Sequence, residues 1–347
     1  MQKALLRVFT LIVSASLAIT AHASGTPSST SKSKQTKASS SSKSQTASKN
    51  KKTKTAEKSK KSKTSVKKEA VAKARSEVAV TRVVATESTL DNPGLRSANA
   101  LIMNALNGQI MYEKNADRPT PIASITKVMT AMVVLDAKLP LNELLTINDD
   151  DIDYLKNTTS RLAVGTELTR GEMLLLALMS SENRAASALG RHYPGGRAAF
   201  LQKMNEKALQ LGMTHTRFLD SNGLNPGNVS TPRDLALMVK AAARYPEIQQ
   251  FSTSSEYILT SNLSGRELTF RNTNPLVKSE DWEISLTKTG YISEAGRCLV
   301  MQAMINGAPV VMVLMDSDGK QSRIGDAQRV KKWLELFNQQ AVVHRAG

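Results

Sequence analysis

The chain has 347 residues and a formal charge of +17, with 47 Lys and Arg against 30 Asp and Glu. Its one cysteine, Cys298, excludes an intramolecular disulfide, and its four scattered histidines lack the spacing of a structural zinc site. We therefore predict neither a metal nor a cofactor for this protein.

The first 23 residues have the pattern of a cleavable export signal. Lys3 and Arg7 precede an apolar stretch at 8–19, and residues 21–23 are small enough for a cleavage site. The apolar stretch is shorter than the about 20 residues that a membrane-spanning helix needs, and we find no second candidate. The sequence therefore predicts a periplasmic protein without a transmembrane segment.

Residues 24–85 form a tail rich in Lys, Ser and Thr. Its segment 24–75 contains 16 Lys and Arg, two Asp and Glu, and no aromatic residue, so that residues 76–347 are close to neutral. Such a composition cannot bury enough apolar surface to offset the entropy of ordering, and we predict disorder. Without aromatic side chains to stack on bases, no nucleic-acid partner is expected. A solvated tether and electrostatic contacts with anionic envelope polymers or lipid head groups both stay open.

The remaining chain alternates between strand-like and helical patterns. Strands are expected at 98–103 and 109–113, joined by an Asn-Gly hairpin signal at 107–108. Helices are then expected at 124–137, 171–190 with a break at 180–183, 196–212 and 231–245. Further strands are expected at 256–260, 267–271, 283–289, 297–305 and 308–315, before a last helix at 324–338. In the helix at 196–212 the expected apolar positions include Phe200, Met204, Leu209 and Leu211, and Trp333 and Leu336 are expected to end the core. This order predicts an α+β fold, in which an antiparallel sheet built from both chain ends carries flanking helices and a mostly helical insert.

The segment "PIASITKVMTAMVVLDA" places Ser124 and Lys127 three residues apart at the start of an apolar helix. Side chains at this spacing share one helix face, and the free N–H groups of a helix start favour negative charge. Burial among the apolar neighbours would lower the pKa of the lysine toward the range of a general base. The pair is a candidate nucleophile and base, although an amphipathic helix with an ordinary lysine also explains it.

Two further motifs carry polar groups that suit the same chemistry. Ser181 and Asn183 lie in the predicted break between helices, where a hydroxyl and an amide can both face a cleft. Lys288, Thr289 and Gly290 end a predicted strand. There the lysine could supply positive charge to a substrate carboxylate, and the glycine could let a substrate backbone approach. Taken alone, each motif is better explained as a polar turn between helices or as an ordinary strand end.

Together, in this order and spacing, the three motifs resemble those of the penicillin-recognising serine acyltransferases. The segments "LLLALMSSENRAA", "HYPGG", "LGMTHTRF", "NVSTPRDL", "FRNTNPLV" and "LTKTGY" further resemble the low-molecular-mass D-alanyl-D-alanine endopeptidases of the penicillin-binding protein seven type. The likeness covers about residues 95–338. It implies a D,D-peptidase domain at 86–347 with the fold shared by penicillin-binding proteins and β-lactamases. It also implies peptidoglycan as substrate, hydrolysis of D-alanyl–diaminopimelyl cross-links through an acyl-enzyme, and β-lactams as covalent inhibitors.

The same resemblance implies catalytic roles. Ser124 would be the acylated nucleophile and Lys127 the acceptor of its proton. Ser181 and Asn183 would be the relay and orienting pair. The backbone N–H groups of Ser124 and Tyr291 would form an oxyanion hole.

Substrate binding would fall to the strand motif. By the resemblance, Lys288, Thr289 and Gly290 would bind the substrate together with Tyr291. Arg323 is a weaker candidate for contact with a carboxylate, because its position also fits a solvated surface arginine.

Three alternatives stay open at this stage. A D-alanyl-D-alanine carboxypeptidase would use the same residues. A β-lactamase needs a further base, and Glu206 is the nearest candidate, although its place on an amphipathic helix favours a surface residue. A non-enzymatic wall-binding protein would explain the basic tail but not three intact motifs.

Overall fold

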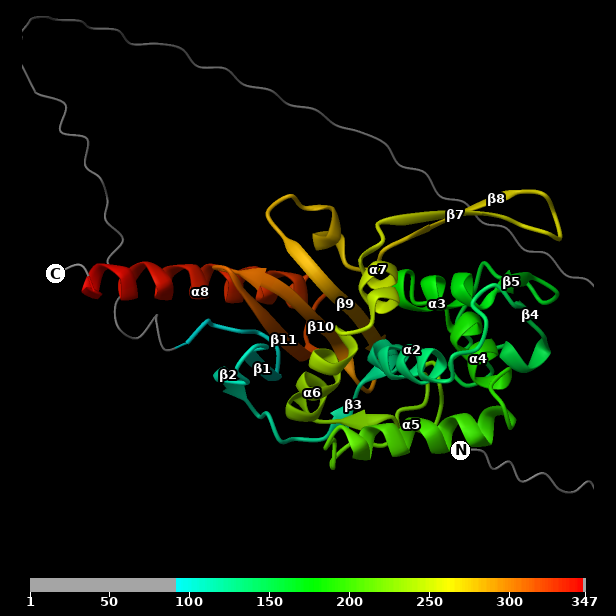
Figure 1. Ribbon diagram of the computed structural model, residues 1–347, viewed down its shortest axis with the longest axis horizontal. Coiled ribbons are helices and arrows are strands. Elements are labelled where there is room, and N and C mark those ends of the chain that lie inside the picture. Colours follow the sequence, from blue (N-terminus) through cyan, green and yellow to red (C-terminus); the bar gives the residue numbers. More distant parts are fainter. Residues whose placement is uncertain (1–91, 346–347) are drawn as a thin grey trace, which may run out of the picture. The chain divides into compact units, whose positions relative to one another are not determined.

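A computed structural model describes residues 92–345, with side chains as far as Phe337 (Figure 1). The predicted signal at 1–23 and the predicted tail at 24–85 lie outside the described residues. Within the part that is described, no helix is both long enough and apolar enough to cross a membrane.

One five-stranded antiparallel sheet organises the domain, in the order β2-β1-β11-β10-β9. Its strands are β1 (Asn99–Asn104), β2 (Ile110–Lys114), β9 (Glu283–Ile292), β10 (Gly296–Ile305) and β11 (Ala308–Ser317). The first hairpin closes at Gly108, whose φ of +76° is a conformation that favours glycine. Because β1 and β2 come from the start of the described chain and β9–β11 from its end, the predicted sheet from both chain ends is confirmed.

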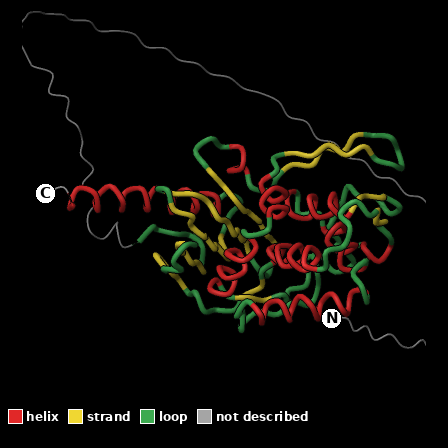
Figure 2. Tube along the Cα trace, viewed as in Figure 1, coloured by secondary structure: helices red, strands yellow, loops and turns green. Residues whose placement is uncertain are grey.

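Helices cover both faces of this sheet (Figures 1 and 2). The helices are α2 (Thr126–Asp136), α3 (Arg170–Met179), α4 (Asn183–Arg191), α5 (Gly196–Gln210), α6 (Pro232–Ala242), α7 (Pro246–Thr253) and α8 (Ser322–Arg345). Along β10, Leu299 and Met301 pack with α8, whereas Cys298 and Val300 pack with the helical insert on the other face. This alternation follows from the two-residue period of a strand, and it produces two apolar cores. The predicted α+β fold is confirmed.

The strands predicted at 256–260 and 267–271 are confirmed as β7 (Glu256–Thr260) and β8 (Glu267–Arg271), which pair with each other in a separate two-stranded sheet. The expectation for two leucines is wrong. Leu209 is 67% exposed and Leu336 is 38% exposed, because each lies on the outer side of its helix. The sequence reading also missed α7 and the short strands, which are β3 (Thr120–Pro121), β4 (Leu144–Thr146), β5 (Glu167–Thr169) and β6 (Val229–Ser230).

Candidate active site

Ser124 lies in η1 (Ala123–Ile125), a single 3-10 turn that leads directly into α2. Ala123 has a φ of +48°, which is uncommon for a residue with a side chain. Gly223 packs against this turn so closely that a Cβ there would lie 2.0 Å from the Ala123 carbonyl oxygen. The turn that presents Ser124 is therefore held by a glycine about a hundred residues further along the chain.

Lys127 is fully buried on the first turn of α2. Its Nζ lies 2.8 Å from Ser124 Oγ, 2.8 Å from Asn183 Oδ1 and 2.5 Å from the Asn222 carbonyl oxygen. A neutral amine can donate its two N–H groups to the Asn183 and Asn222 oxygens, which can only accept hydrogen bonds. Its lone pair then faces the hydroxyl proton of Ser124. The geometry suits proton transfer from the serine to the lysine.

Burial also sets the protonation of this lysine. Removal from water lowers the pKa of Lys127 from 10.5 to about 7, while the negative charges of Asp220 and Glu182 oppose the shift. A lysine with an ordinary pKa would be almost entirely protonated at neutral pH and could not accept a proton. Lys127 is therefore neutral in a substantial fraction of molecules near pH 7.

This pKa predicts the pH dependence of acylation. We expect the second-order rate constant for acylation of Ser124 by benzylpenicillin to rise with pH through about 7 and then level off, because only neutral Lys127 accepts the serine proton. The measurement is a rate profile from about pH 5 to about pH 9, with circular dichroism at each pH as the control for folding. A rate that stays constant across this range would contradict the role of Lys127 as the base.

Ser181 and Asn183 lie in the break between α3 and α4, as predicted. Ser181 has a φ of +64°, and its Oγ accepts a hydrogen bond of 2.8 Å from Lys288 Nζ. Asn183 begins α4, and its amide donates to Thr158 Oγ1 at 3.0 Å while its oxygen accepts from Lys127. The two buried lysines are thus each bonded to a serine hydroxyl.

Lys288 lies on β9, the edge strand of the sheet, and is 1% exposed. Burial lowers its pKa well below the ordinary value, and the positive charges of Lys127 and Arg323 act in the same direction. From the sequence we expected Lys288 to carry a positive charge. The structure instead holds Lys288 where positive charge is disfavoured until an anion, such as a substrate carboxylate, enters.

At Gly290, strand β9 packs closely against the turn that carries Ser124. A Cβ at this position would lie 3.0 Å from the Ile122 carbonyl oxygen and 3.1 Å from the Ser124 backbone nitrogen. The absence of a side chain at Gly290 therefore lets β9 approach the turn that carries Ser124. The strand continues past Gly290 to Ile292 and includes Tyr291.

These residues line a cleft of about 400 Å³. The lining residues are Ser124, Thr158, Ser181, Asn183, Leu224, Thr273, Thr289, Gly290, Tyr291 and Arg323. Thr289 bonds Thr273 across the cleft with Oγ1 atoms 2.7 Å apart, and Tyr291 is 56% exposed at the rim. The structure thus brings together all the predicted site residues, with Lys127 and Lys288 buried behind the lining. Within the described residues, no group of three or more His, Cys, Asp or Glu is placed to hold a metal ion.

Arg323 is not the surface residue that its position in the sequence favoured. It lines the cleft and is partly buried, and its Nε and Nη1 are buried atoms without a hydrogen-bond partner in the described structure. Unpaired buried donors of this kind are costly unless a ligand satisfies them. The cleft therefore contains a free guanidinium suited to a carboxylate.

The sequence reading missed the segment 220–225. The Asp220 carboxylate accepts hydrogen bonds from the backbone N–H groups of Asn222, Gly223 and Asn225, and so fixes the loop that offers the Asn222 carbonyl to Lys127. The segment "DSNGLNPGN" is dense in residues that favour turns, which was the available signal. Nothing in that pattern indicated which carbonyl would face the lysine.

The chain is similar to known proteins both in sequence and in structure. Residues 86–319 match the family described as D-alanyl-D-alanine carboxypeptidase. The D-alanyl-D-alanine endopeptidase of Pseudomonas aeruginosa is 48% identical over 241 residues, which cover 70% of this chain and 78% of that protein. The D-alanyl-D-alanine endopeptidase of Escherichia coli is 47% identical over 266 residues, covering 77% and 85%. The solved structure of the Streptomyces K15 DD-transpeptidase has a TM-score of 0.65 and 32% identity, covering 70% of this chain and 98% of that one.

The fold and the serine–lysine pair together define a serine acyl-transfer enzyme of the penicillin-binding class. The chain belongs to the D-alanyl-D-alanine carboxypeptidase family and is a serine-type D-Ala-D-Ala peptidase, a hydrolase.

Proposed function

We propose that this protein is a D,D-endopeptidase that hydrolyses D-alanyl–diaminopimelyl cross-links of peptidoglycan through an acyl-enzyme on Ser124. The observation that carries the proposal is the 2.8 Å contact between Lys127 Nζ and Ser124 Oγ, with the lysine fully buried. Such an arrangement lets a hydroxyl lose its proton as it attacks a carbonyl.

In the first step, Ser124 Oγ attacks the carbonyl carbon of D-alanine, and its proton passes to Lys127 Nζ. The bond between this carbonyl and the amine of the neighbouring stem peptide then breaks. The leaving nitrogen takes a proton that Lys127 returns through the Ser181 hydroxyl. An ester between Ser124 and the acyl peptide remains.

The oxyanion formed during the attack needs donors that are already in place. The backbone N–H groups of Ser124 and Tyr291 supply them, because Gly290 brings β9 against the Ser124 backbone. In the second step, a water molecule attacks the ester, gives its proton to Lys127 and releases the peptide. The proton then returns to Ser124 Oγ.

Recognition of the leaving side rests on positive charge. The amine released from the cross-link is attached to a carbon that also carries a carboxylate. The terminal D-alanine of an uncut stem carries a carboxylate at the same position. We assign this carboxylate to Arg323 and the Thr289 hydroxyl, which line the cleft together, with Lys288 behind them. Its entry would raise the pKa of Lys288, because it adds a negative charge to a buried positive site.

The choice of bond distinguishes an endopeptidase from a carboxypeptidase. Two relatives at 48% and 47% identity are named endopeptidases, whereas the family as a whole is described as a carboxypeptidase. We expect the purified protein to convert dimeric muropeptides to monomers and to trim pentapeptide monomers only weakly. Separation of the muropeptides by liquid chromatography measures both reactions in one sample. If pentapeptides lose D-alanine readily while dimers stay intact, the enzyme is a carboxypeptidase.

A β-lactamase activity has little support. Glu206, the sequence candidate for a deacylating base, lies on α5 and is paired with Lys203 at 3.1 Å rather than facing the cleft.

Our proposal also includes export to the periplasm by the signal at 1–23, a disordered tail at 24–85 and a catalytic domain at 86–347. Contact of the tail with envelope polyanions belongs to it as well.

A further inference from the structure

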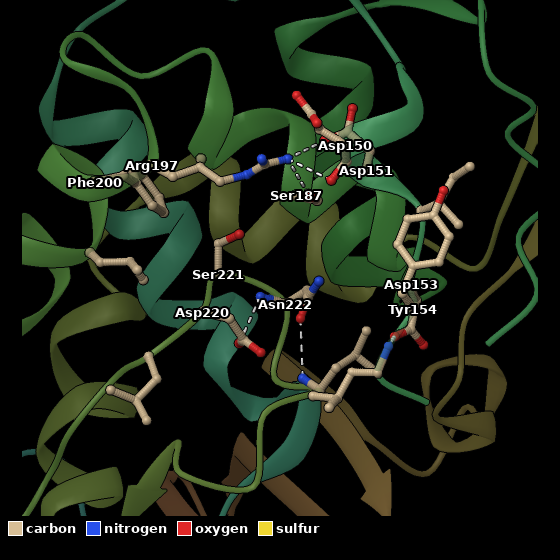
Figure 3. Close-up of a pocket in the computed structure, with 16 residues that line it drawn as sticks. Asp150, Asp151, Asp153, Tyr154, Ser187, Arg197, Phe200, Asp220, Ser221 and Asn222 are labelled. Carbon is tan, nitrogen blue, oxygen red and sulfur yellow. Dashed lines mark hydrogen bonds and ion pairs between the residues drawn. The ribbon is translucent and has the colours of Figure 1, made fainter. Parts of the chain in front are cut away.

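A second hollow, which we call the side pocket, lies beside the cleft and has a volume of about 320 Å³. Leu224 lines both hollows, so the two adjoin at this residue. One wall of the side pocket is the loop that contains Asn222 (Figure 3). The carbonyl oxygen of Asn222 accepts a hydrogen bond from Lys127. The side pocket therefore shares a wall with the loop that contacts Lys127.

The walls of the side pocket are largely apolar. Phe200, Leu201 and Leu224 line it, and Leu155 and Leu219 at its edge are 58% and 42% exposed. Large apolar side chains left exposed around a hollow are typical of ligand sites. The side pocket is thus suited to an occupant with a short aliphatic chain.

Four carboxylates line the side pocket, and three of them form ion pairs or hydrogen bonds within the domain. Asp151 pairs with two arginines. Asp153 and Asp220 accept hydrogen bonds from the backbone of their own loops. The exposed Asp150 carboxylate makes no hydrogen bond or ion pair with any described residue. It is therefore free to bind a cation.

The Arg197 guanidinium contacts the backbone of the residue that carries this free carboxylate (Figure 3). Arg197 Nη2 donates to the Asp150 carbonyl oxygen at 2.7 Å, to Asp151 Oδ1 at 3.2 Å and to Ser187 Oγ at 3.3 Å. The Nε and Nη1 of this half-exposed side chain donate to no described residue. One end of the side pocket thus presents a free carboxylate beside free guanidinium donors, the complement of an amino-acid group with its ammonium and carboxylate on one carbon.

We propose that the side pocket binds the free amino-acid end of the diamino acid that precedes D-alanine in the acyl half of the substrate. This inference rests on the proposed function. The methylene chain of the diamino acid lies against Leu219 and Leu224, its ammonium binds Asp150, and its carboxylate binds Arg197. A lysine side chain has the ammonium alone and leaves Arg197 without a partner. The site therefore selects stems with diaminopimelate over stems with lysine.

Penicillins that differ only in the acyl side chain test this proposal. The probe carries a terminal amino-acid group on a four-methylene chain, and two analogues have its amine acetylated or its carboxylate converted to an amide. Benzylpenicillin serves as the reference for each protein. We expect the wild-type protein to be acylated about three- to fivefold faster by the probe than by either analogue, as a partly exposed ion pair allows.

The variant Asp150→Asn should lose the preference for the free amine. Asp149→Asn changes an exposed neighbour that does not line the side pocket, and it should keep the preference. The amide analogue tests Arg197 without a substitution that would also remove its bonds to the fold, and thermal unfolding checks each variant. Equal rates for the probe and both analogues in the wild-type protein would overturn the side-pocket assignment, with normal labelling by benzylpenicillin leaving the proposed function intact. Failure of benzylpenicillin to label Ser124 would instead overturn the proposed function, and the inference with it.

Discussion

Replacing Ser124 with alanine is expected to abolish both covalent labelling by penicillin and hydrolysis of dimeric muropeptides. The substitution removes the only atom that forms the acyl ester, whereas the surrounding turn keeps its backbone contacts. Ser124 is partly exposed in the cleft and contributes one hydrogen bond to Lys127, so the free energy of unfolding should change by no more than about 1 kcal/mol.

The measurement is mass spectrometry of the protein after incubation with benzylpenicillin, together with thermal unfolding. Ser264→Ala is the matched control, because this serine is exposed in the turn between β7 and β8. A covalent adduct on the Ser124→Ala protein would show that another residue is the nucleophile. Loss of labelling together with a large loss of stability would leave the catalytic role without support.

Replacing Lys127 with methionine should reduce the rate of acylation by about 10²- to 10⁴-fold, the range that a general base contributes. Methionine fills a similar volume among the apolar neighbours but cannot accept a proton. Because serine and lysine act as one unit, the loss should approach that of Ser124→Ala. The residual rate should also lose the rise through about pH 7 that we assign to this lysine.

Stopped-flow or quench measurements of acylation, over the same pH range, provide the rate. Lys138→Met is the matched control, since Lys138 is exposed directly after α2. A Lys127→Met protein that is acylated at near the wild-type rate would exclude Lys127 as the base. In that case, Lys288 would be the remaining lysine bonded to a serine hydroxyl within the described site.

Local patterns predicted the elements of this fold well, for a physical reason. Periodic apolar residues, turn residues and helix caps act over a few positions, and so the strands at both ends and the helices between them could be found from sequence. Which strands pair with one another depends on contacts between distant segments. The β7–β8 hairpin shows this, because its alternating residues read as strands but do not indicate that the hairpin stays apart from the main sheet.

The same distinction between local patterns and long-range contacts applies to the candidate active site. The spacing of Ser124 and Lys127, within an apolar segment, was enough to predict a buried lysine with a lowered pKa, since both features arise inside one helix turn. Arg323 could not be placed in this way. Its position at the start of α8 fits a surface residue, and only the packing of α8 against the sheet turns it into the cleft.

By itself, the sequence determined the candidate reacting groups, the order of the three motifs and the class of chemistry, because each motif is read from neighbours along the chain. The tertiary structure alone decided how those groups are held. The Asn222 carbonyl contacts Lys127 across 95 residues of sequence, and Gly290 approaches the Ser124 backbone from a strand far along the chain. Such contacts depend on where whole loops and strands come to lie as the core packs, and no local pattern encodes that position.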